Sequence, residues 1–311
     1  MLTSMCTTVT VSPFPLFLLL GRKGCGDFVV VGWYTGVEGA FSCSPSVLTV
    51  SFYKHDLGFF PGSGGLGDTG KGGGKYCAVN VPLKGGMNRA SFVPLFTSVM
   101  EAAKASFSPE AVVFQCGADA LAGDPTRAFN LSSECYAACL RLVLRWSLPT
   151  LVLGGGGYNH CNTAKCRTLL TAVCLEERQQ RHGDGKGESV SRSENAVLAG
   201  LSEDLPEHDL LSEYAGDYSL PVREGMMKNE NTPENLQALL ATVVANLEKL
   251  GQAQAQDLGQ VDDSEGEEEE EDKSSQEALE ESEDSVDDHD EDTTTDGPNN
   301  NKKRRLEESF A

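Results

Sequence analysis

Two stretches decide the fold of this chain: AVVFQCGADALAGD at residues 111–124 and TLVLGGGGYN at residues 150–159. Each begins with a short apolar run typical of a buried strand and continues into a segment rich in glycine and polar residues. In an open parallel sheet, ligands bind beyond the carboxyl ends of the strands. If the two strands are neighbours, Asp119 and Tyr158 face one pocket.

The segments around these stretches repeat the alternation of strand and helix. Residues 47–52 and 76–81 are two further apolar runs bounded by Gly, Pro or polar residues. The segments of helical length are residues 92–107, 132–146 and 162–175. This alternation is typical of a parallel sheet covered by helices on both faces, so the predicted fold class is α/β.

The predicted folded domain covers residues 36–250, with a polar surface loop inserted at about residues 176–199. Residues 1–35 show no clear periodicity and are interpreted as a non-matching leader from a mispredicted or mis-spliced start. Leucines and valines between residues 236 and 250 recur at helical spacing, after Thr232 as N-cap and Pro233 at the first helical position. We expect this closing helix to pack on the domain.

Acidic residues dominate the C-terminal region. Between Asp262 and Asp292 there are 19 Asp or Glu and one Lys, a net charge of −18. Taking −18 from the chain's −22 leaves −4 for the rest, so the domain is nearly neutral. A run of this density repels itself and has little apolar surface to bury, so residues 251–311 are predicted to form a disordered acidic tail. We expect no direct nucleic-acid partner.

Three features bear on location. The ten cysteines include no CxxC pair and no dense disulfide spacing, which predicts free thiols in a reducing compartment. The apolar run at residues 13–20 is too short to span a bilayer, so no membrane partner is expected. KKRR at residues 302–305 is a basic cluster of the kind that serves in nuclear import. The nucleus is the expected location, with the cytoplasm as an alternative.

Two glycine-rich stretches invite a phosphate-binding interpretation. GSGGLG at residues 62–67 matches GxGxxG, but further glycines and then a strand follow it instead of a helix, so dinucleotide binding is not expected. The four glycines at residues 154–157 are followed by the bulky Tyr158 and not by Gly-Lys-Ser/Thr. These four glycines allow either a tight turn or the close approach of a ligand to the main chain.

A series of motifs makes the chain similar to the class I, zinc-dependent histone deacetylases. The motifs follow family order and spacing: FFPG at 59–62, GGKY at 73–76, QCGAD at 115–119, GDP at 123–125, FNL at 129–131, GGGGY at 154–158 and NTA at 162–164. The resemblance runs without gaps over residues 36–175 and covers the C-terminal half of such an enzyme. It implies an arginase/deacetylase-like, mostly parallel sheet flanked by helices and incomplete at the N-terminus.

The resemblance implies hydrolysis of N-acetyl-lysine with zinc, on histones or other proteins, in chromatin regulation and transcription repression. Asp119 matches a zinc ligand, Tyr158 matches the catalytic donor of a hydrogen bond to the developing oxyanion, and Phe60 matches one wall of the acyl-lysine tunnel. The floor of the substrate pocket matches Gly154, Gly155, Gly156 and Gly157. A structural potassium ion is expected at the main-chain carbonyls of Phe41, Ser44, Val47 and Cys77.

Other positions depart from the family pattern. The Asp-Leu-His stretch that supplies further zinc ligands matches residues 28–34, with Val30 and Gly32 at the ligand positions. Neither residue can bind a metal, and a catalytic zinc site normally uses three protein ligands. The histidine pair that serves as general base has no counterpart, because the first histidine is His55. A substitute ligand from His55 or His160 is a less favoured alternative.

Two further departures concern partners and packing. Pro125 and Lys165 occupy positions where corepressor-bound family members carry arginines that hold an inositol phosphate, so neither partner is expected here. Arg167 replaces an aromatic residue usual in the family. Two functions stay open: a lysine deacetylase by descent, and a non-catalytic protein of the same fold that acts at most as a scaffold or binding module. The two functions predict different metal contents.

Overall fold

The computed structural model describes residues 27–32, 37–56, 58, 59, 62, 64–182 and 202–261 of the 311-residue chain. Most of the expected leader, the second part of the inserted loop, the acidic tail after residue 261 and the KKRR cluster lie outside the described residues. Phe60, the expected tunnel wall, also lies outside them. The expectations for these segments stay predictions.

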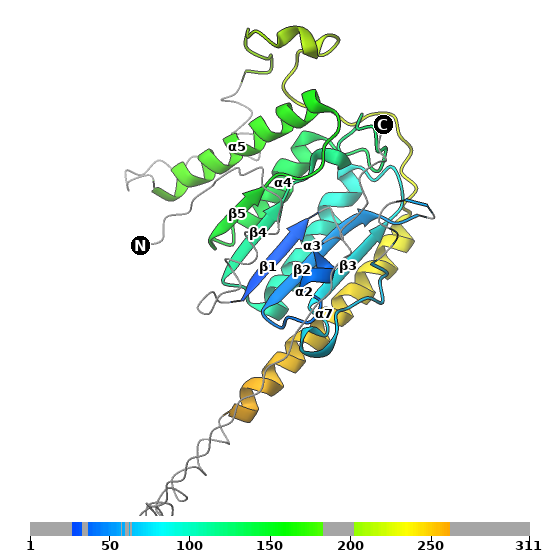
Figure 1. Cartoon of the computed structure of the whole chain (residues 1–311), viewed down its shortest axis with the longest axis vertical. Coiled ribbons are helices and arrows are strands. Elements are labelled where there is room, and N and C mark those ends of the chain that lie inside the picture. The colour runs from blue at the N-terminus through cyan, green and yellow to red at the C-terminus, as the bar shows by residue number, and fades with distance from the viewer. Residues whose placement is uncertain are drawn as a thin grey trace, which may run out of the picture. The chain divides into compact units, whose positions relative to one another are not determined.

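Five parallel strands form one sheet in the order β3-β2-β1-β4-β5 (Figure 1). The strands are β1 at Phe28–Gly32, β2 at Val47–Lys54, β3 at Ala78–Leu83, β4 at Ala111–Gln115 and β5 at Thr150–Leu153. Every neighbouring pair is parallel, which confirms the α/β class and the parallel sheet. Four of the five strands lie where the apolar runs predicted them.

The central strand comes from the segment that was expected to be a leader. Phe28–Gly32 pairs with β2 on one side and with β4 on the other, so that Val30 lies between Thr49 and Val113. All five residues of this strand are buried. A continuous run of valines suits a strand that is covered on both faces. The sheet therefore begins before residue 36.

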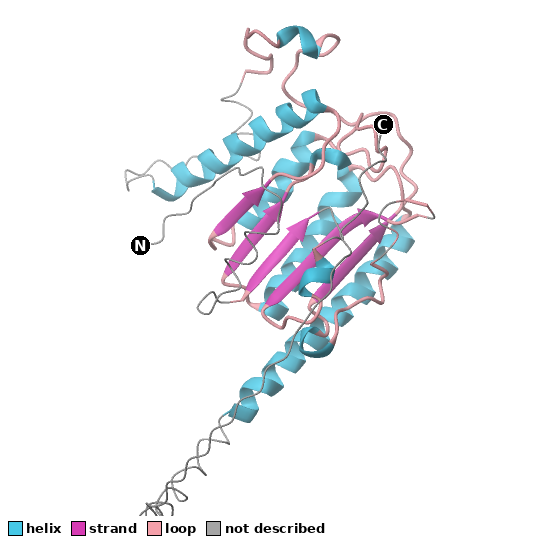
Figure 2. Ribbon diagram, in the orientation of Figure 1, coloured by secondary structure: helices cyan, strands magenta, loops and turns pink. Residues whose placement is uncertain are grey.

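Helices cover the two faces of the sheet unequally. The long helices are α3 at Arg89–Phe107, α4 at Ser133–Leu144, α5 at His160–His182 and α7 at Pro233–Val261, and α2 at Glu38–Phe41 is short. In Figure 2, α2 lies in front of the sheet and α3 lies behind it. The main core joins Val29 and Val31 of β1 to Phe92 and Phe96 of α3. A smaller cluster on the opposite face includes Phe28, whose ring centroid is 6.1 Å from that of Phe41 in α2.

The expected loop at residues 176–199 is partly helical. Helix α5 continues to His182, so its last turns replace the start of that loop. The polar character of this part was misleading because Glu176 forms an ion pair with Arg141 of α4, at 3.3 Å between Nη2 and Oε2. A polar helix face can serve a contact with another helix as well as solvent.

The closing helix is confirmed. The Oγ1 atom of Thr232 accepts a hydrogen bond from the Asn235 N–H at 3.3 Å, as an N-cap does. Val243, Leu247 and Leu250 are buried in the main core, so α7 packs on the sheet domain. The helix runs to Val261 and not to about residue 250, because Ala and Gln after Gly251 are good helix formers.

Two other expectations concern the described residues. Cys43, Cys77, Cys116, Cys135, Cys139, Cys161, Cys166 and Cys174 are all free thiols, as predicted. None of the helices within these ranges combines the length and apolar character that crossing a membrane would require.

Candidate functional site

The candidate site lies at the carboxyl ends of two adjacent strands. Strand β4 leads into the short 3-10 helix η2 at Ala118–Ala120, which carries Asp119, and β5 leads into the glycine run at 154–157. The Cys116 N–H donates to the Leu153 carbonyl at 2.8 Å, and the Ala118 N–H donates to the Gly156 carbonyl at 2.7 Å. The two loops expected to form the site are therefore joined by backbone hydrogen bonds.

Close packing against protein groups explains three of the four glycines. A Cβ on Gly156 would overlap the Asp119 carboxylate, and one on Gly155 would lie 3.1 Å from Cα of Gly117. Gly157 has a φ of 128°, a conformation that L side chains rarely adopt, and its Cβ would lie 2.5 Å from Oγ1 of Thr163. The outer side of the run stays accessible because Gly155 is exposed. Substrate binding by these glycines stays a prediction.

The environment of Asp119 disfavours its charged form. Partial burial raises the pKa of this carboxyl to about 6, a hydrogen bond from its own backbone opposes the rise, and the nearby Asp124 charge adds to it. A cation beside the carboxylate would have the opposite effect. A raised carboxyl pKa of this kind is common at functional sites, and a bound cation would favour the charged form of Asp119.

Asp124 holds the backbone around Tyr158, a contact that sequence reasoning missed. Its Oδ2 accepts hydrogen bonds from the N–H groups of Tyr158 at 2.7 Å and of Asn159 at 3.3 Å. Its Oδ1 accepts from the backbone and the hydroxyl of Thr126, at 2.9 and 2.7 Å. The bond from the Thr126 N–H forms an Asx-turn, which the sequence Asp-Pro-Thr could have suggested. Nothing in the sequence near Asp124 indicates its bond to Tyr158, which lies 34 residues later.

Tyr158 is 53% exposed as a residue, while its N–H is fixed by Asp124. The phenol is therefore accessible to a ligand in solution. The structure brings together the loops that carry Asp119 and Tyr158, as expected from neighbouring strands. That both side chains face one pocket stays a prediction.

The described residues do not fit a catalytic zinc ion. Val30, at one expected ligand position, is packed with Val113 and Leu153 in the smaller apolar cluster. At the other position, a Cβ on Gly32 would lie 3.1 Å from both Cβ and Oε1 of Gln115. In the part of the chain that the structure describes, no three His, Cys, Asp or Glu residues gather as a metal site would need, and this includes His55 and His160.

The four carbonyls expected to hold potassium lie around α2, β2 and the residue before β3. The Phe41 carbonyl accepts a hydrogen bond from the Ser44 N–H at 2.9 Å, and the Cys77 carbonyl accepts one from the Thr49 N–H at 2.9 Å. The Cys77 carbonyl also accepts a hydrogen bond from the Thr49 hydroxyl, at 3.4 Å. Potassium binding stays a prediction.

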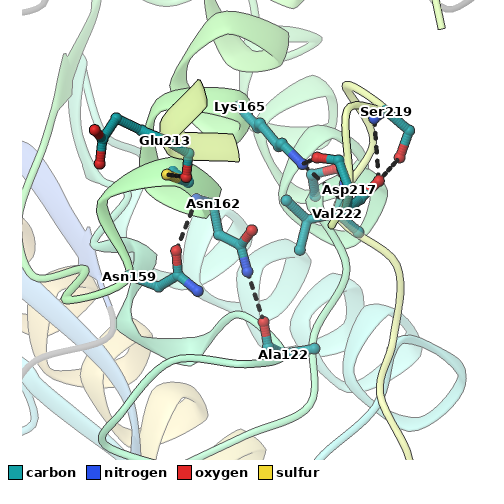
Figure 3. A network of polar contacts seen from close by, with 10 residues as sticks. Ala122, Asn159, Asn162, Lys165, Glu213, Asp217, Ser219 and Val222 are labelled. Carbon is teal, nitrogen blue, oxygen red and sulfur yellow. Dashed lines mark hydrogen bonds and ion pairs between the residues drawn. The ribbon is translucent and has the colours of Figure 1, made fainter. Parts of the chain in front are cut away.

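Lys165 is a buried structural cation. Its ammonium donates to the carbonyl and to Oδ2 of Asp217, at 2.7 and 3.1 Å (Figure 3). It also lies 5.7 Å from the centre of the Tyr214 ring. The pKa of Asp217 is lowered, mainly by the hydrogen bond from Ser219 and also by Lys165. Lys165 thus fastens α5 to the segment before α7.

Arg167 contacts the glycine run from α5. Its Nη2 donates to the Gly155 carbonyl at 3.5 Å, and its Nε is buried without a partner among the described residues. A Cβ on Gly154 would lie 3.0 Å from Nη2, so the guanidinium packs close to that position. Sequence reasoning had noted only a change of packing here.

Comparison with known proteins gives consistent matches. Residues 35–174 match the family model described as histone deacetylase domain. The chain is 42% identical to histone deacetylase 8 of Danio rerio over 215 residues, which is 69% of this chain and 51% of that protein. It is 39% identical to histone deacetylase 8 of Xenopus laevis over 215 residues, 69% of this chain and 59% of that protein. It is 38% identical to histone deacetylase 1 of Homo sapiens over 218 residues, which is 70% of this chain and 40% of that protein. The chain spans about half the length of the histone deacetylase 8 relatives.

Proposed function

We propose, from the premise that this chain belongs to the histone deacetylase family through residues 35–174, that it acts on N-acetyl-lysine of histones or other proteins. The hydrogen-bonded junction of the loops after β4 and β5 supports the proposal most directly. It joins the QCGAD and GGGGY motifs, which carry the family's site residues, at the edge of the sheet where ligands bind.

In this proposal the Tyr158 hydroxyl donates a hydrogen bond to the acetamide oxygen of acetyl-lysine. Negative charge builds on the carbonyl oxygen when a nucleophile adds to its carbon, and a preorganised O–H donor stabilises that charge. The Tyr158 phenol is exposed, and Asp124 fixes the backbone from which it projects. Gly155, exposed in the same loop, would lie beside the acyl-lysine chain.

Hydrolysis is a separate question, because the family's zinc does not fit the donors of the described residues. Asp119 would be one ligand in the family arrangement, and Val30 and Gly32 offer no second or third. We therefore assign no step of the reaction to a metal in this chain. This observation favours a second candidate function, in which the chain binds acetyl-lysine as a non-catalytic module.

Paired peptides distinguish the functions. The full chain is mixed with an acetyl-lysine peptide labelled with a fluorophore, and binding is followed by anisotropy while hydrolysis is followed by mass spectrometry. The same peptide without the acetyl group is the control, since it carries more positive charge and reports attraction to the acidic tail alone. Both candidates predict tighter binding of the acetylated peptide, weakened by Tyr158→Phe. Loss of the acetyl group identifies the deacetylase; equal binding of the two peptides contradicts both candidates.

We also propose a nuclear location from the KKRR cluster at residues 302–305. Replacing the four basic residues with alanine should shift a fluorescently tagged chain towards the cytoplasm. An unchanged nuclear distribution in microscopy would contradict the role of this cluster.

A further inference from the structure

A second site candidate lies on another part of the domain. A pocket of about 640 Å³ opens between α2 and the loop at residues 64–75. Its lining includes Glu38, Asp68, Thr69, Lys71 and Lys75, and it contains no residue of the loops after β4 and β5. Asp68 and both lysines are exposed, whereas Thr69 is buried. The pocket is thus lined by both exposed and buried polar side chains.

Two buried side chains project from the face of the sheet that contacts the pocket loop. Asn80 of β3 pairs with Ser51 of β2, two residues before Tyr53, so Asn80 and Tyr53 project from the same face of the sheet. Tyr53 is 5% exposed and Asn80 is 3% exposed. The Asn80 amide donates to the Asp68 carbonyl at 2.8 Å, which places its side chain at the pocket loop.

These two side chains each leave one polar atom without a partner. Within the described ranges, neither the Tyr53 hydroxyl nor Oδ1 of Asn80 has a hydrogen-bond partner. Buried polar groups are nearly always hydrogen-bonded, and an exception calls for an explanation such as an ion or a water molecule. Both atoms can supply a lone pair to a cation.

The charges around these atoms are negative. Burial raises the pKa of Glu38, a hydrogen bond from Asn80 opposes the rise, and the charge of Asp68 adds to it. Burial also raises the pKa of Tyr53, and the charges of Glu38 and Asp68 raise it further. The two carboxylates therefore lie within electrostatic reach of the Tyr53 hydroxyl. A cation among them would offset the repulsion that these groups exert on one another.

We propose that Glu38, Asp68, Asn80 and Tyr53 form a binding site for a hard divalent cation of the Ca²⁺ type. All four donors are oxygens, and Ca²⁺ prefers oxygen ligands in a flexible arrangement that water can complete. This donor set shares no residue with the main-chain carbonyls expected to hold potassium. Lys71 and Lys75 line the same pocket, so moderate and not high affinity is expected.

The cation would fasten α2 and the pocket loop to strands β2 and β3. The Lys71 N–H already donates a hydrogen bond to the Ser42 carbonyl at 2.7 Å, which joins the pocket loop to the end of α2. Gly70 and Gly74 pack closely in the same place, because a Cβ on Gly74 would lie 2.6 Å from the Ser42 carbonyl oxygen. Binding of the cation should therefore stabilise the folded chain.

Tyrosine-sensitised terbium luminescence tests the site in the full chain. Tb³⁺ takes the same oxygen ligands as Ca²⁺ and emits strongly only when an excited aromatic ring is close to it. Residues 262–292 contain no aromatic residue, so ions bound to the acidic tail stay dark. Excess potassium chloride keeps the expected potassium site filled. We expect saturable emission that Ca²⁺ displaces.

Charge-matched variants show where the emission comes from. Glu38→Gln and Asp68→Asn should each weaken Tb³⁺ binding by tenfold or more, about 1.4 kcal/mol, whereas Glu110→Gln removes one exposed carboxylate elsewhere and should have no effect. Circular dichroism identifies any variant that fails to fold. In a second measurement, Ca²⁺ should raise the melting temperature of the unmodified chain but not that of Glu38→Gln. Emission unchanged in both site variants, or no displaceable emission, would overturn the proposal and leave water as the occupant of the pocket.

Discussion

At the scale of single residues, Asp124 does more for the candidate site than its place in the GDP motif suggested. Its carboxylate accepts from Tyr158, Asn159 and Thr126 and is only 4% exposed. The sequence predicts Asp119 and Tyr158 as site residues because both follow apolar strands and match family motifs. It could not indicate the contact between Asp124 and Tyr158, or that between Lys165 and Asp217, because each joins segments far apart in the chain.

Replacing Asp124 tests its role in holding the loop. Asp124→Asn keeps the shape, but the amide cannot accept on both sides, so at least one partly buried donor loses its partner. We expect the free energy of unfolding to fall by about 1–3 kcal/mol in urea denaturation. Asp209→Asn, at an exposed position, is the matched control and should change little. Equal stability of the two variants would contradict the role given to Asp124.

The glycine run offers a second test at this scale. Gly156→Ala places a Cβ against the Asp119 carboxylate, and overpacking of this kind costs roughly 1–3 kcal/mol. Gly67→Ala is the control, because a Cβ there meets nothing within 4 Å. Thermal melting should separate the two variants clearly. A Gly156→Ala chain as stable as the Gly67→Ala chain would show that the loop has room for a side chain.

At the scale of elements, the apolar runs predicted four strands, and the segments of helical length between them predicted the helices. The central strand β1 was missed, since its valines lie among many glycines in a stretch without periodicity. The ends of α5 and α7 were also misjudged. Polar composition indicated a loop and a tail there, but it is equally compatible with a helix that keeps one face polar.

Helix α7 supplies the prediction at this scale. Leu247 is fully buried in the main core, so Leu247→Ala should lower the free energy of unfolding by about 2–5 kcal/mol. Gln252→Ala, at an exposed position of the same helix, changes helix propensity only slightly and serves as the control. Equal denaturation midpoints for the two variants would mean that α7 does not pack on the domain in solution.

At the scale of the whole molecule, the family match predicts a zinc site, whereas the described residues do not supply its ligands. Residues 35–174 match the family model described as histone deacetylase domain, and the sheet brings the expected site loops together. The same sheet places Val30 in an apolar cluster and Gly32 against Gln115, where the resemblance called for metal ligands. The sequence already indicated that these two ligands are missing, and the described structure offers no replacement ligands around Asp119.

Zinc stoichiometry tests this account most directly. The full chain is incubated with zinc, dialysed against a weak chelator that strips ions from the acidic tail, and analysed by inductively coupled plasma mass spectrometry beside Asp119→Asn. The account predicts much less than one zinc ion per chain and the same value for both proteins. One retained zinc ion per chain that disappears in Asp119→Asn would contradict it.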